Sequence, residues 1–180
     1  MKGVMERINR EVTGYAEASL HFCQSKENPM ENEEIRAAEV EKLSQSEKRE
    51  QVFVSLFLSG FYEEKEKDEA LSNYYEMQNF SAALTEQIRS RYLGVKEHLG
   101  SIDAMLQKYA IGWDLNRMGK AEISILRLAV YEILFDEAIP EKVAANEAVE
   151  LAKKYGTNES YSFINGILGK VIASSHESGL

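Results

Sequence analysis

The sequence predicts an all-α fold: a compact bundle of about seven helices joined by short loops, with a partly helical N-terminal extension. The chain has 180 residues but only 2 prolines and 11 glycines, and its 44% hydrophobic content is enough for a sizeable core. Apolar residues recur at three- and four-residue steps, and no stretch keeps the alternation that is typical of a β-strand. We therefore expect helices throughout and no sheet.

The N-terminal quarter of the chain is predicted to be an extension of unknown role. Residues 4–22 carry apolar side chains that could share one helical face, and residues 25–32 have the composition of a linker. Residues 33–43 are good helix formers but have only a thin apolar stripe. The expected organisation is an extension at 1–45, a main domain at 46–176 and a tail at 177–180.

The first half of the main domain should contain two helical stretches. Ser46 precedes three charged residues and is predicted to cap a helix, whose apolar face contains Phe53, Leu56 and Phe57. The charged run at 63–69 is typical of a solvated turn or a helix end. Further along, a long helix should begin at Asn79 or Ser81, break or bend at Gly100 and Ser101, and end at Gly112 and Trp113.

The centre of the core is predicted at residues 120–135, because this segment is apolar on nearly every side. Arg127 lies within the apolar run, where an unpaired charge would be costly. We therefore expect an ion pair that fixes helix packing, with Glu147 as the plausible partner.

Two further helices should complete the bundle. Pro140 marks the start of the first, and Gly156 is expected to end it in a left-handed cap. Asn158 or Ser160 can cap the last helix. Within these helices Gly166 and Gly169 predict a close-packing contact, and Asn146 and Asn165 are expected to satisfy backbone groups at helix crossings.

The charge balance argues against a protein that holds nucleic acid by charge alone. The formal net charge is −9, and none of the segments 1–45, 46–80 and 81–180 has more basic than acidic residues. The longest mostly apolar run, Val52 to Tyr62, is about half of the roughly 20 residues that span a bilayer. We expect a cytoplasmic protein that uses no membrane.

No pattern in the chain predicts catalysis, a metal site or a cofactor. The three histidines, His21, His98 and His176, lie far apart, and Cys23 is the only cysteine. The chain has no Gly-rich phosphate loop, and pairs of carboxylates are expected by chance among 30 acidic residues.

Three blocks in the second half of the chain resemble the NusB family of bacterial transcription antitermination factors. The blocks are WDLNRMGKAEISILRLAVYEIL at 113–134, IPEKVAANEAVELAKKYG at 139–156 and SYSFINGILGKV at 160–171, and they follow the family's order and spacing. The segment KREQVFVSLFLSGFYE at 48–63 is similar to a divergent version of the family's first helix.

This resemblance implies two packed helical subdomains and a function without catalysis. The family binds the boxA element of nascent ribosomal RNA transcripts together with NusE, a small-subunit ribosomal protein. That complex helps RNA polymerase, with other Nus factors, to read through terminators. The expected partners of this chain are therefore boxA RNA and NusE.

The resemblance also implies candidate site residues. The family's basic cluster near the first helix corresponds to Lys48 and Arg49, although Gln45, Ser46 and Glu47 stand where basic residues are usual. Its second RNA-facing region is the start of the last helix, which contains Glu159, Tyr161 and Phe163. An aromatic side chain there can stack on a base, and Phe163 can equally be a core residue. Glu122 matches a position that faces NusE, or is a solvated first-turn residue.

The sequence is also compatible with two other functions. The chain could be a protein–protein adaptor that kept the NusE face and lost most of its RNA affinity, as the depleted basic cluster suggests. It could also be the RNA-binding module of an rRNA cytosine methyltransferase, which would require a catalytic domain elsewhere. Homodimer formation through residues 4–22 is open as well.

Overall fold

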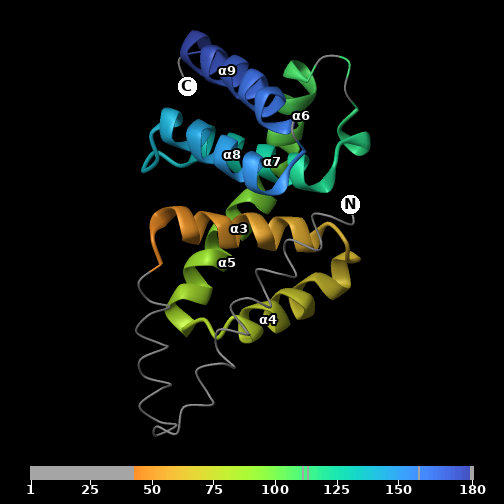
Figure 1. Cartoon of the computed structure of the whole chain (residues 1–180), viewed down its shortest axis with the longest axis vertical. Helices are drawn as coiled ribbons and strands as arrows, with labels where there is room; N and C mark the ends of the chain where they lie inside the picture. The colour runs from red at the N-terminus through yellow and green to blue at the C-terminus, as the bar shows by residue number, and fades with distance from the viewer. Residues whose placement is uncertain (1–42, 111, 113, 158, 179–180) are drawn as a thin grey trace, which may run out of the picture. The chain divides into compact units, whose positions relative to one another are not determined.

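The computed structural model describes residues 43–178 except 111, 113 and 158. In that part of the chain there are seven α-helices, two short 3-10 helices and no strand, as the sequence predicts (Figure 1). The elements are α3 (Gln45–Ser59), η1 (Glu64–Glu66), α4 (Lys67–Met77), α5 (Ala82–Glu97), α6 (Leu99–Tyr109), η2 (Leu115–Arg117), α7 (Lys120–Phe135), α8 (Glu141–Tyr155) and α9 (Ser160–Ser178). The expectations for residues 1–42, which include His21 and Cys23, lie outside the described residues.

The chain divides into two compact units, and the boundary falls inside α5 between Ser90 and Arg91. In the first unit α3 packs against α4. The helix α3 begins one residue before Ser46, and Ser44 is its N-cap. The prediction of a Ser46 cap was therefore wrong, because Ser44 and Glu47 form a reciprocal capping box in which each side chain accepts the other's backbone N–H.

The helix α4 corrects the prediction of a turn or helix end at 63–69. The charged run forms η1 and then the first turn of α4. The negative charges of Asp68 and Glu69 are favourable there, because the N-terminus is the positive end of the helix dipole. The spacing of Leu71, Tyr74 and Tyr75 places all three on the buried face. Tyr74 donates a hydrogen bond to the side-chain carbonyl of Gln51, and the hydroxyls of Tyr75 and Ser55 lie 3.0 Å apart. Aromatic residues with a polar tip thus fix α4 to α3.

The break between α5 and α6 lies at His98 rather than at Gly100 and Ser101. The His98 ring packs on the Phe135 ring with 4.1 Å between centroids, and its Nδ1 lies 2.9 Å from the carbonyl oxygen of Gly94. These side-chain contacts, rather than a local helix breaker, accompany the break between the two helices. His98 is a half-buried structural histidine, which agrees with its isolation in the sequence.

The core of the second unit is built around α7, as the sequence predicts. This helix packs against α6, α8 and α9, which lie around it in Figure 1. Ten of its residues are buried, among them Ile125, Leu126 and Val130. Because neighbours cover it on several sides, an apolar residue is favoured around most of its circumference.

The predicted ion pair of Arg127 is present, but with a different partner. Its guanidinium donates two hydrogen bonds of 2.8 Å to the carboxylate of Asp103 on α6, so the expectation of Glu147 was wrong. The planar fork of an arginine fits both oxygens of one carboxylate. The Asp103 position is not distinguishable in sequence from any other acidic helix residue, since the pair spans 24 positions.

A second, more buried pair was absent from the sequence predictions. Arg91 donates to Glu132 at 3.2 Å and to Asp136 at 2.7 Å. The Glu132 side chain is 1% exposed, so the ion pair with Arg91 offsets part of the cost of burying its charge. The pair therefore fixes α5 to α7 within the second unit.

The glycine and asparagine predictions for α8 and α9 need correction. Pro140 is the N-cap of α8, and Gly156 ends that helix with φ −87° and ψ −171°, which is extended rather than left-handed. Glycine is required at 156 by close approach, since a Cβ there would lie 2.6 Å from both the Ala152 carbonyl oxygen and the Ser160 Cβ.

A Cβ at Gly166 or Gly169 would meet nothing within 4 Å, so these residues make no close-packing contact. Asn146 and Asn165 are exposed instead of lying at buried helix crossings.

Candidate nucleic-acid and partner interface

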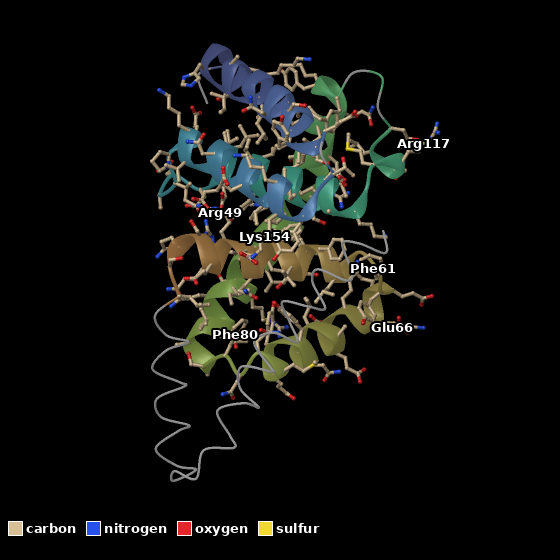
Figure 2. All side chains as sticks on the ribbon, in the orientation of Figure 1. Arg49, Phe61, Glu66, Phe80, Arg117 and Lys154 are labelled. Carbon is tan, nitrogen blue, oxygen red and sulfur yellow. The ribbon has the colours of Figure 1, made fainter. Side chains whose placement is uncertain are left out.

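The start of α3 carries the two basic residues of the predicted RNA contact. Lys48 is half-buried, and its Nζ donates to the side-chain oxygen of Gln87 at 3.2 Å. Arg49 is only 4% exposed and lies toward the opposite end of α3 from Phe61 (Figure 2). Glu47 is held by the capping box, with its carboxylate 2.7 Å from the Ser44 backbone nitrogen. Of the predicted basic pair, Lys48 therefore has the more accessible side chain.

The start of α9 presents the second set of predicted residues. Glu159 is exposed, and Tyr161 is 45% exposed, which agrees with the expected surface position of Tyr161. Phe163 is intermediate in exposure, between the core and surface alternatives that the sequence left open. The next turns of α9 are anchored by Ile164, Ile167 and Leu168, which are fully or almost fully buried. The exposed tyrosine is thus held by a rigid, well-packed helix.

Glu122 joins this second set through a hydrogen bond that could not be predicted from the sequence. The Ser160 hydroxyl donates to Oε1 of Glu122 at 2.6 Å, although the two residues are 38 positions apart. The same serine oxygen accepts the Thr157 N–H at 2.8 Å and lies 2.9 Å from the Thr157 hydroxyl. Glu122 is therefore bound to the first turn of α9 and is not a freely solvated residue.

The structure brings some of the predicted residues together and leaves others in separate units. Glu122, Glu159, Tyr161 and Phe163 belong to the second unit, and Glu122 is hydrogen-bonded to Ser160, the first residue of α9. Lys48 and Arg49 belong to the first unit. Sequence reasoning missed Ser160 and Thr157 as members of the site, because serine and threonine before a helix are ordinary capping residues.

Within residues 43–178, outside the gaps given above, no three His, Cys, Asp or Glu side chains are grouped to hold a metal ion. None of the described helices is long and apolar enough to cross a bilayer.

Most of the chain matches the model of one protein family. The model of the NusB family matches residues 34–173. The chain belongs to the NusB family. Two curated NusB relatives, both named transcription antitermination protein NusB, match over nearly their whole length. The one from Lachnoclostridium phytofermentans is 45% identical over 131 residues, covering 72% of this chain and 99% of the relative. The one from Agathobacter rectalis is 42% identical over 129 residues, covering 71% and 98%.

Solved NusB structures share the fold. A NusB structure from T. maritima is 33% identical with a TM-score of 0.65, and the match covers 77% of this chain and 99% of that one. A complex of the antitermination factors NusB and NusE with dsRNA is 22% identical with a TM-score of 0.60, covering 73% and 99%. At that identity the second match bears on the fold alone. The resemblance inferred from the three sequence blocks is thereby confirmed at the level of the family.

Proposed function

We propose that this chain is a transcription antitermination factor that binds the boxA element of nascent ribosomal RNA transcripts together with NusE, and through them acts on RNA polymerase with other Nus factors. The observation that carries the proposal is the match to antitermination proteins named NusB over 99% and 98% of their lengths. The solved NusB neighbour that contains NusE and dsRNA gives the proposed partners a precedent in the same fold. We propose that the protein acts in the cytoplasm, without catalysis and without a cofactor.

The charge of the chain supports a division of work between the two partners. With a net charge of −9, the protein gains little from general attraction to phosphates. Stacking of a base on an exposed aromatic ring contributes about 1–3 kcal/mol without any positive charge. We therefore assign RNA contact to Tyr161, with Glu159 and Phe163 near it in sequence, and to Lys48, with Arg49 next to it. We assign the attraction of a basic protein partner to the acidic side chain of Glu122.

The deciding experiment titrates a labelled boxA RNA against the full chain, with and without NusE, at two salt concentrations. We expect weak binding by the chain alone and tighter binding with NusE. Because few phosphates are neutralised, the affinity should fall only modestly as salt increases. Undetectable RNA binding even at saturating NusE would refute the proposal.

Two exposed tyrosines provide a matched pair for locating the RNA contact. Tyr161 and Tyr62 are both 45% exposed, but only Tyr161 lies at the start of α9. Tyr161→Ala should weaken RNA binding about 5- to 150-fold, the range expected for the loss of one stacked base, while Tyr62→Ala should leave it unchanged. Lys48→Ala should weaken binding and reduce its salt dependence. Arg49 is a poor position for such a test because it is buried, and its substitution would disturb the fold.

A protein–protein adaptor with weak RNA affinity is the second candidate. The burial of Arg49 favours it, because it reduces the basic surface at the start of α3, where Glu47 also places an acidic side chain. In the titration above, this candidate predicts unchanged NusE binding and no RNA binding. The methyltransferase-module candidate is less well supported, since the matching relatives are named as antitermination proteins.

We also propose that residues 46–176 form the functional domain, with 1–45 as an extension and 177–180 as a tail. A chain that begins at Leu43 keeps the Ser44 cap of α3. It should melt cooperatively and bind RNA and NusE as the full chain does. Loss of cooperative melting would place part of residues 1–42 in the core.

A further inference from the structure

Three polar side chains and two glycines surround the junction between the start of α7 and the turn before α9. Ser160 is 4% exposed, and its hydroxyl contacts Glu122 and Thr157 at the distances given above. The 2.6 Å separation from the carboxylate is short, as is typical when a hydroxyl donates to an ionised acceptor. The hydrogen bonds of this junction therefore centre on a buried side chain rather than on the exposed surface.

The direction of each hydrogen bond at the junction follows from the chemistry of the groups. A carboxylate has no proton to give, so the single Ser160 proton points to Glu122. The two lone pairs of the Ser160 oxygen are then available to the Thr157 N–H and to the Thr157 hydroxyl, which must donate. All hydrogen-bonding capacity of Ser160 is used, and its arrangement depends on Glu122.

The glycines show how little room the junction leaves. A Cβ at Gly119 would lie 2.1 Å from Oε2 of Glu122, so any side chain at 119 would displace the carboxylate. A Cβ at Gly156 would lie 2.8 Å from the Ser160 hydroxyl oxygen. The backbone at Gly119 thus lies close to the Glu122 carboxylate, and the backbone at Gly156 lies close to the Ser160 hydroxyl. Neither position has room for a side chain.

We infer that Glu122 is a positioning residue for RNA binding, in addition to any contact that it makes with a protein partner. Through Ser160 it ties the start of α7 to Thr157 and to the first residue of α9, next to Glu159 and Tyr161. This inference rests on the proposed RNA-binding function of the α9 start. It predicts an effect of Glu122 on RNA affinity in the absence of NusE.

The variants that test this separate the hydrogen bond from the charge. Ser160→Ala removes the donor and keeps the Glu122 charge, whereas Glu122→Gln removes the charge and keeps an oxygen that can accept. Glu122→Ala removes both. The matched control is Ser162→Ala, because Ser162 is an exposed serine in the same turn whose hydroxyl donates to the Glu159 carbonyl instead.

The measurement is the affinity of labelled boxA RNA for the full chain without NusE, and again at saturating NusE. It is made at a temperature where circular dichroism shows every variant folded. We expect Ser160→Ala and Glu122→Ala each to weaken RNA binding about 5- to 10-fold, the size expected for one lost hydrogen bond. Glu122→Gln and Ser162→Ala should bind within about twofold of the unaltered chain. Because the two residues act as one unit, the double variant Glu122→Ala/Ser160→Ala should be no weaker than either single variant.

The outcomes distinguish this inference from its rivals. If Ser160→Ala lowers the melting temperature but binds RNA as tightly as Ser162→Ala, the junction is only structural and the inference is wrong. If Glu122→Gln loses NusE binding and every variant keeps RNA binding, Glu122 acts only by charge on the protein partner, and the inference is again wrong. If the unaltered chain binds no RNA even with NusE, the proposed function itself has failed.

Discussion

The hydroxyl group of Tyr131 occupies the space where a side chain at position 94 would begin. A Cβ built on Gly94 would lie 2.4 Å from that oxygen and 2.8 Å from the ring carbon that carries it. Tyr131 also stacks on Phe135 with 6.1 Å between centroids and lies 5.8 Å from the His98 ring. The glycine thus allows α5 and α7 to approach where this aromatic cluster forms.

Gly94→Ala should therefore destabilise the protein even though alanine is the better helix former. The clash with a packed ring costs about 1–3 kcal/mol, which outweighs the roughly 1 kcal/mol gained from helix propensity. Gly166→Ala is the matched control, because Gly166 also lies within a helix and its Cβ would meet nothing within 4 Å. Urea denaturation should show loss of stability for Gly94→Ala and a gain for Gly166→Ala. A gain for both would mean that the Tyr131 ring moves aside freely.

Gly156→Ala should also destabilise the protein, and for a different reason. Its Cβ would lie 2.6 Å from a backbone oxygen of α8, which cannot swing away as a side chain can. We expect a loss of about 1–3 kcal/mol by urea denaturation. Gly169→Ala provides the comparison, since a Cβ there has open space. Equal stability of the two variants would contradict the close approach at the end of α8.

The bidentate pair between Arg127 and Asp103 should contribute measurably to stability. Both side chains are partly buried, at 29% and 31% exposure, so Asp103→Ala leaves a charged guanidinium with two unmet hydrogen bonds. The expected loss is about 1–3 kcal/mol. Glu150→Ala, which breaks the exposed pair with Lys153, should change stability by less than about 0.5 kcal/mol. Thermal melts of the two variants make the comparison, and indistinguishable midpoints would show that the Arg127 pair adds nothing.

Tyr131 should make the protein less stable at high pH. Burial raises the pKa of its hydroxyl above the ordinary 10.0, the Asp136 charge adds to the rise, and Arg91 opposes it. Since the folded state holds this proton more tightly, the stabilising contribution is complete below pH 10 and is lost as the pH rises through the folded-state pKa. Melts between pH 9 and 11 should show a steeper fall for the unaltered chain than for Tyr131→Phe. If the melting temperatures of the two proteins fell in parallel with pH, the loss of stability at high pH would come from groups other than Tyr131.

Periodicity predicted the parts of the fold that depend on one helix and its own apolar face. The segment 120–135 is apolar around most of its circumference, and ten residues of α7 are buried. The same reasoning missed α4, because its first turn is a dense charged run and only Leu71, Tyr74 and Tyr75 form its buried face. Negative charge at the N-terminus of a helix is favourable, so a run of charged residues does not by itself indicate a turn.

Contacts between distant segments could not be predicted in this way. Arg127 needed an acidic partner, but several acids were available and only the packing of α6 on α7 selects Asp103. Likewise, nothing near Glu122 in sequence points to Ser160. The candidate site residues came from the family resemblance, while the hydrogen bonds that hold them came only from the fold.

The buried carboxylate of Glu132 has a consequence for how the family's sequences can diverge. With 1% of its side chain exposed and Arg91 at 3.2 Å, the Glu132 carboxylate loses this ion pair in the core when Arg91 alone is replaced, which is costly. Homologues that lack an arginine at this position should therefore also lack the acid on α7, so that the two positions covary. Asp136 is more exposed, at 22%, and should vary with less constraint.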